Sequence, residues 1–197
     1  YTLGKGDIKV ALYDFGAKNN IAASLVKRGC EVTVYPASTL ASTVLEGNYD
    51  GIMLSNGPGD PAECVDIIKQ MQILMKSGTP IFAICLGHQL MALAHGFETE
   101  KLKYGHHGAN HPVKDLDTNQ VYISTQNHNY VVKEDTIDPS IARPWFKNVN
   151  DGTIEGVEYL KENIKTVQFH PEACAGPLDT NYLFDEFIKM MGGNKNA

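Results

Sequence analysis

The chain has 197 residues, of which 43% are hydrophobic and 20% charged, and its formal net charge is −6. This length allows one substantial hydrophobic core, and the ordinary composition argues against a disordered chain. The negative charge and the absence of any run of Lys or Arg disfavour binding to nucleic acid or to an anionic membrane surface.

The first half of the chain alternates apolar segments with amphipathic ones. The expected strands are 8–15, 31–36, 51–55 and 80–84, and the expected helices are 17–29, 39–47, 62–78 and 86–94. Such alternation predicts an α/β fold with a doubly wound, mostly parallel sheet and helices on both faces.

The second half is richer in β-structure. Its expected short strands are 97–102, 120–125, 129–132, 153–160 and 164–169. A closing amphipathic helix is expected over 178–192, with Leu183, Phe184, Phe187, Ile188 and Met191 on one face.

No membrane segment or disulfide framework is expected. No apolar run approaches the roughly 18 residues that span a bilayer, and the start YTLGKGD has no signal-peptide pattern. The cysteines lack CxxC spacing, so reduced thiols in a cytoplasmic protein are the simpler interpretation. They are Cys30, Cys64, Cys85 and Cys174.

Cys85 is the cysteine whose position suggests chemistry. It follows the apolar strand PIFAI and precedes the helical segment LGHQLMALA, and a sharp strand-to-helix turn exposes a side chain beside the first N–H groups of a helix. A cysteine attacks as its thiolate, which a nearby imidazole favours. Packing is the expected role of Cys30 and Cys64, and filling a loop near the site is that of Cys174.

The segment QFHPEA offers that imidazole. His170 follows the expected strand 164–169, and Glu172 lies two residues further on. Taken alone, His170 is an ordinary strand-end histidine. A Cys–His–Glu triad is predicted only if the fold brings Cys85 beside it.

Two glycine-containing turns could bind a substrate. SNGPGDP, 55–61, follows a buried strand, and its N–H groups could cradle a phosphate or stabilise an oxyanion, or it could be a plain turn. It lacks the Lys-Ser/Thr ending of a P-loop. DFGAKNN, 14–20, has one glycine and so no dinucleotide fingerprint. Its Lys18 could influence the site, but it is expected to be a solvated first-turn lysine.

Histidines gather in YGHHGANHP and QNHNY, at His106, His107, His111 and His128. No carboxylate or cysteine is placed in sequence to complete a familiar ligand set, and the glycines indicate turns. We therefore expect no metal site.

These motifs resemble those of a known family. ICLGHQ, QFHPEA and SNGPGDP are similar to the motifs of class I (triad) glutamine amidotransferases, which have a flavodoxin-like fold. DFGAKNN with GHHGANHPV resembles, more narrowly, the carboxyl-terminal glutaminase domain of carbamoyl-phosphate synthetase small subunits. The resemblance covers nearly the whole chain.

The resemblance implies glutamine hydrolysis through a thioester on Cys85, with His170 as general base and acid and Glu172 as its orienting partner. Gly57 and Leu86 would supply oxyanion N–H groups. The implied glutamine-binding residues are Gly59, Gln89, Asn127, Asn129 and Tyr130. Gly and Phe are the commoner residues at positions 129 and 130, so the Asn129 side chain could alter binding if it enters the site.

The same resemblance implies a partner: a large synthetase subunit that receives ammonia through a channel and makes carbamoyl phosphate for pyrimidine and arginine synthesis. This domain would need no cofactor, because ATP and Mg²⁺ would be used by the partner. We expect one domain over 1–197, with 1–6 as a linker from a missing amino-terminal domain and 192–197 as a frayed tail. Without its partners the chain is expected to be a weak glutaminase.

Three alternatives remain open. Another triad amidotransferase, of the anthranilate or GMP synthase type, would pass ammonia to a different synthetase. A cysteine peptidase or γ-glutamyl hydrolase would cleave peptides. An inactive binding module would keep the fold, but the presence of all three triad residues disfavours it.

Overall fold

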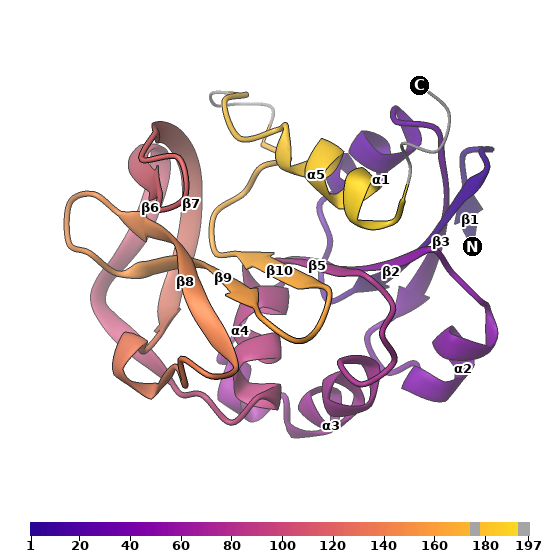
Figure 1. Cartoon of the computed structure of the whole chain (residues 1–197), viewed down its shortest axis with the longest axis horizontal. Coiled ribbons are helices and arrows are strands. Elements are labelled where there is room, and N and C mark those ends of the chain that lie inside the picture. The colour runs from indigo at the N-terminus through magenta and orange to yellow at the C-terminus, as the bar shows by residue number, and fades with distance from the viewer. Residues whose placement is uncertain (174–177, 193–197) are drawn as a thin grey trace.

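A computed structural model describes residues 1–173 and 178–192. A single ten-stranded sheet runs through the molecule in the order β1-β3-β2-β4-β5-β10-β9-β8-β6-β7 (Figure 1). The strands are β1 (Thr2–Leu3), β2 (Ile8–Asp14), β3 (Cys30–Pro36), β4 (Gly51–Leu54), β5 (Ile81–Ile84), β6 (Thr99–Asp115), β7 (Val121–Val132), β8 (Ala142–Asn148), β9 (Ile154–Tyr159) and β10 (Ile164–Val167).

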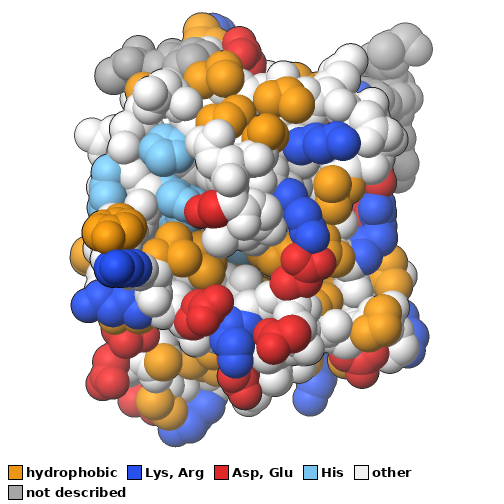
Figure 2. Space-filling model, turned by 90° about the vertical axis from the view of Figure 1, so that its left-hand side faces the viewer, with side chains coloured by type: hydrophobic (Ala, Val, Ile, Leu, Met, Phe, Trp, Pro, Cys, Tyr) orange, Lys and Arg blue, Asp and Glu red, His pale blue; other side chains and the backbone are white. Residues whose placement is uncertain are grey.

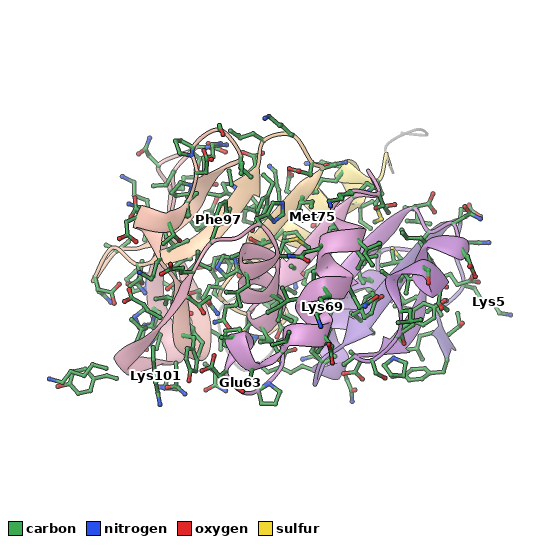
Figure 3. All side chains as sticks on the ribbon, turned by 90° about the horizontal axis from the view of Figure 1, so that it is seen from below. Lys5, Glu63, Lys69, Met75, Phe97 and Lys101 are labelled. Carbon is green, nitrogen blue, oxygen red and sulfur yellow. The ribbon has the colours of Figure 1, made fainter. Side chains whose placement is uncertain are left out.

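Helices cover both faces of the parallel part. They are α1 (Asn19–Val26), α2 (Ala41–Glu46), α3 (Val65–Leu74), α4 (Leu86–Ala94) and α5 (Leu183–Met190), with 3-10 turns η1 (Pro61–Glu63) and η2 (Glu134–Thr136). One hydrophobic core lies under α1 and α5, and a second lies under α2, α3 and α4. Figure 3, the view from below, shows α3 and α4 covering one face of the sheet. Lys69 is labelled on α3. The predicted α/β class is confirmed.

The sheet is mixed and not mostly parallel as predicted, because its pairing changes from parallel to antiparallel along its width. Strands β3, β2, β4, β5 and β10 are parallel, and pairing is antiparallel from β10 through β9, β8, β6 and β7. Parallel pairing therefore aligns the carboxyl ends of β2, β4, β5 and β10 at one edge of the sheet. This edge carries the site.

The β-rich half differs from the sequence prediction. The segments 120–125 and 129–132 belong to one strand, β7, and YGHHGANHP lies within β6 and is not a turn. Its glycines Gly105 and Gly108 have φ of 68° and 131° and mark irregularities in the β6–β7 pairing, where glycine is tolerated as a bulge. The strand β8, which contains Pro144, was not predicted.

The ends of the expected elements also shift. The helix expected at 62–78 begins as η1, where Pro61 is the first residue and Asp60 Oδ1 accepts from Ala62 N–H, and α3 starts only after Cys64. In the expected linker 1–6, β1 pairs with β3. The loop with Cys174 and most of the expected tail 192–197 lie outside the described residues. Within the described residues, none of the helices is long and apolar enough to span a membrane.

Candidate active site

Cys85 lies at the sharp turn between β5 and α4. Its main chain has φ 53° and ψ −103°, a region that non-glycine residues rarely adopt. The turn is held on both sides, because Cys85 N–H donates to Val167 O of β10 (2.8 Å) and Gly87 N–H donates to Ser55 O after β4 (3.1 Å). The strained turn therefore holds the side chain at the carboxyl edge of the sheet.

His170 reaches the same edge from β10, which is the parallel neighbour of β5. Its N–H donates to Thr125 O of β7 (2.9 Å), which fixes the chain after the strand. Nδ1 of the ring donates to Glu172 Oε1 at 2.7 Å, and both side chains are buried. The hydrogen bond to Glu172 thereby leaves Nε2 as the atom that can exchange a proton with the nucleophile.

Burial by itself lowers the pKa of His170, but interactions with Cys85 and with Glu172 outweigh it and raise the pKa to about 9. The imidazole of His170 is therefore mainly protonated at neutral pH. An imidazolium next to a cysteine stabilises the thiolate, which is the reactive form.

A cavity of about 440 Å³ opens in front of Cys85 and His170. Eight of the ten predicted site residues line it: Cys85, His170, Gly57, Gly59, Gln89, Asn127, Asn129 and Tyr130. The other two are Leu86, which follows Cys85 in the chain, and Glu172, which comes two residues after His170. The triad is thus assembled at the mouth of a pocket that can enclose a small substrate.

The loop at 55–61 approaches α4 closely. A Cβ atom on Gly57 would lie 2.4 Å from Phe15 O and 2.7 Å from Leu86 Cδ2, so only glycine fits there. Gly57 and Leu86, the two predicted oxyanion donors, are therefore neighbours in space. The N–H of Leu86 lies in the first turn of α4, where N–H groups lack a partner within the helix.

A family model described as glutamine amidotransferase class-I matches residues 11–190. The chain belongs to the class I glutamine amidotransferase family. The solved structure of a protein described as a component of GMP synthase, from Thermoplasma acidophilum, shares this fold, with a TM-score of 0.82 over 95% of this chain and 96% of that one, at 21% identity. A glutamine amidotransferase from Thermotoga maritima aligns with a TM-score of 0.69, at 16% identity over 96% of this chain and 86% of that one.

Among proteins similar in sequence are carbamoyl phosphate synthase small chains. That of Neisseria meningitidis serogroup A is 50% identical over all of this chain and 54% of its own length. That of Salmonella typhimurium is 52% identical over 92% of this chain and 47% of its own length. The chain thus spans about half the length of these relatives.

Two residues at this candidate site were not among those assigned to it from the sequence. Lys18 is not simply solvated, because its Nζ lies 3.6 Å from Glu172 Oε1 and its side chain lines the cavity. Asn56 accepts from Lys18 N–H (3.1 Å) and so joins the start of α1 to the loop after β4. The only sequence signal was their place within the two glycine-containing turns.

The side chain of Asn129 turns toward β6. Its Oδ1 lies 3.1 Å from His107 Nε2, and Asn127 Oδ1 lies 3.0 Å from His107 Nδ1. The amide oxygens of both residues are thus directed at a β6 histidine. Contacts of Asn129 with a substrate would then come from its main chain, which makes the residue type at 129 less important.

We expected no carboxylate beside the histidines of β6 and β7, and this expectation is wrong. Glu155 of β9 completes a cluster with His106 and His128 in which one ligand atom of each lies within 4.8 Å of the others. His106 Nε2 also lies 2.8 Å from Asp151 Oδ2, and hydrogen bonding to Glu155 is the main cause that raises the pKa of His106. The histidine-rich face of β6 and β7 is visible in Figure 2.

Proposed function

We propose that this chain is the glutaminase part of a glutamine-hydrolysing carbamoyl phosphate synthase. The observation that carries the proposal is the buried Cys85–His170–Glu172 arrangement at a cavity, in a chain 50% identical to a carbamoyl phosphate synthase small chain. The GMP synthase type remains the alternative within the family, and its solved relative supports only the fold.

In the proposed reaction the Cys85 thiolate attacks the side-chain carboxamide of glutamine. The carbonyl oxygen becomes an oxyanion, which the N–H groups of Gly57 and Leu86 would stabilise, an effect typically worth about 3 kcal/mol per donor. The His170 imidazolium then protonates the leaving nitrogen, and ammonia departs to leave a thioester on Cys85.

Water completes the cycle. His170, now neutral, accepts a proton from the water that attacks the thioester, so glutamate leaves and the thiolate–imidazolium pair is restored. The net reaction converts glutamine and water into glutamate and ammonia. Glu172 would hold the imidazole in place through both steps.

The ammonia would pass through a channel to a large synthetase subunit, which would combine it with bicarbonate and ATP to make carbamoyl phosphate. ATP and Mg²⁺ would be used by that partner and not by this chain. The product would serve pyrimidine and arginine synthesis, and the cytoplasm is the proposed location.

The test is reconstitution with the large chain of a carbamoyl phosphate synthase. With the parent chain we expect carbamoyl phosphate to form from glutamine. With Cys85→Ala we expect it to form when ammonium is supplied but not when glutamine is. Glutamine hydrolysis that never yields carbamoyl phosphate, but supports GMP synthesis with a GMP synthetase subunit, would favour the alternative.

A further inference from the structure

The carbonyl oxygen of Tyr130 joins the wall of the cavity to the helix of the nucleophile. It accepts from Gln89 Nε2 at 2.8 Å and lies 2.9 Å from His128 Nδ1. Gln89 lies one turn after Cys85 on α4, and residues 127–130 line the cavity. This carbonyl therefore ties the β7 wall of the cavity to the helix that begins after Cys85.

From His128 a chain of hydrogen bonds leads away from the cavity into the sheet. His128 Nε2 lies 2.8 Å from Gln126 Oε1, and Gln126 Nε2 donates to Glu155 Oε2 at 2.8 Å. The side chain of Glu155 is fully buried. Its other oxygen accepts from Asn148 Nδ2 at 3.0 Å and lies 3.3 Å from His106 Nδ1.

A buried carboxylate is costly unless its neighbours compensate for the lost water. None of the Lys or Arg side chains in the described parts of the chain pairs with Glu155; its contacts are Gln126, Asn148 and His106. The carboxylate can only accept hydrogen bonds, so it turns the NH₂ end of the Gln126 amide toward itself and the oxygen toward His128.

This orientation places the His128 ring between two acceptors, Gln126 Oε1 and Tyr130 O. Burial is the main influence and lowers the pKa of His128 to about 4, while the charge of Glu155 and the bond to Tyr130 O oppose it. The neutral ring has one N–H for these two acceptors, so the position of the Gln126 oxygen decides how the ring is turned toward Tyr130 O. An apolar residue at position 155 would leave the Gln126 NH₂ group only its longer bond to Ser124 Oγ (3.2 Å), so the amide, and with it the ring, would be held less firmly.

We propose that Glu155 is a positioning residue for the substrate pocket, acting through Gln126 and His128 on the Tyr130 carbonyl. The proposal rests on the glutaminase function above and adds a residue of β9 that touches no substrate. A cation bound by His106, His128 and Glu155 is the competing interpretation. It is disfavoured because the Gln126 amide already fills the contact between His128 and Glu155.

The test separates recognition of glutamine from reactivity of the thiol. Each variant is labelled at Cys85 with a diazoketone analogue of glutamine, which gives a half-saturating concentration and a maximal rate, and separately with iodoacetamide, which needs no amino-acid pocket. The variants are Glu155→Leu, Glu155→Gln, and Val157→Ala as a control that loses buried volume in the same strand.

We expect Glu155→Leu to raise the half-saturating concentration of the analogue about tenfold or more, which is equivalent to about 1.4 kcal/mol, because a buried hydrogen bond that positions the pocket wall is lost. Its maximal rate of labelling by the analogue and its rate of labelling by iodoacetamide should stay within about twofold of the parent values, a much smaller change than the tenfold one. Glu155→Gln can still accept from Gln126 and should largely restore the parent value. Val157→Ala should resemble the parent. If Glu155→Leu does not fold, Gln126→Met can replace it. That variant removes the contact between Gln126 and His128 and should raise the half-saturating concentration in the same way.

Three results would overturn the proposal. The first is an unchanged half-saturating concentration in Glu155→Leu, and the second is an equal rise in Val157→Ala. The third is stoichiometric Zn²⁺ binding to the parent chain, seen by calorimetry and lost in Glu155→Leu, which would make the cluster a metal site. If the parent chain reacts with iodoacetamide but its labelling by the analogue never saturates, the proposed glutaminase function is wrong, and this inference fails with it.

Discussion

Cys85, the proposed nucleophile, has an unfavourable backbone conformation. Its φ of 53° places Cβ near neighbouring main-chain atoms, a strain of about 1–3 kcal/mol that surrounding hydrogen bonds must offset. The Cys85 and Gly87 N–H groups make two of these bonds, to β10 and to the end of β4. The strain is thus stored at the residue that carries the proposed chemistry.

This strain predicts an order of stability among inactive variants. Cys85→Gly removes Cβ and should have a higher free energy of unfolding than Cys85→Ala by about 1 kcal/mol, despite the greater flexibility of glycine when unfolded. Urea denaturation of the two variants measures the difference. Equal stability, or a less stable glycine variant, would mean that the turn is not strained.

At the residue scale the sequence was informative where motifs are local. Cys85, His170 and Glu172 were identifiable because each stands just after a predicted strand, and the structure brings them together. Glu155 was not identifiable from the sequence, because its partners Gln126 and His106 lie on other strands. A carboxylate within an apolar strand gives no local signal.

At the scale of elements, the contact between α4 and β4 sets the position of Cys85, the proposed nucleophile. A Cβ atom on Gly87 would lie 2.8 Å from both Leu54 Cβ and Leu54 O. These are closer than packed atoms approach, so the helix could accept a side chain only by moving away from the strand.

Gly87→Ala is therefore expected to destabilise the fold by about 1–3 kcal/mol and to reduce glutamine hydrolysis sharply. Gly96→Ala, at the other end of α4, is the matched control: its φ is 83°, and an added Cβ would meet no atom of the described residues within 4 Å. That variant should lose some stability but keep its hydrolysis rate. Equal loss of hydrolysis in both variants would contradict a specific role for the α4–β4 contact.

The elements of the parallel half follow from sequence because buried strands and amphipathic helices have distinct patterns. The long strands β6 and β7 do not, since Gly105 and Gly108 resemble turn residues and become bulges only through pairing with β7. Strand β8 was also hard to predict, because it contains Pro144, which has no N–H to donate within a sheet and therefore argues against a strand.

For the whole molecule, burial of His88 connects stability to pH. Its side chain is fully buried between α4 and the sheet, Nδ1 lies 2.7 Å from Thr166 Oγ1, and Nε2 has no partner among the described residues. Burial is the main cause that lowers the pKa of His88 to about 3. The folded chain therefore holds this ring neutral, whereas the unfolded chain protonates it below about pH 6.5.

The free energy of unfolding should consequently fall as pH decreases below about 6.5, by up to about 1.4 kcal/mol per pH unit from this group, until the folded ring is itself protonated. His88→Asn removes the group and should flatten the dependence. Urea denaturation at several pH values between about 7 and 4.5 tests this. Parallel curves for parent and variant would contradict the assignment.

The role of Cys85 as the nucleophile of a glutamine pocket can be tested by peptide mapping after brief exposure to the diazoketone analogue of glutamine, with and without excess glutamine. We expect one adduct, on Cys85, that glutamine prevents. Equal labelling of Cys30, Cys64 and Cys85, or labelling of Cys85 that glutamine does not reduce, would contradict it.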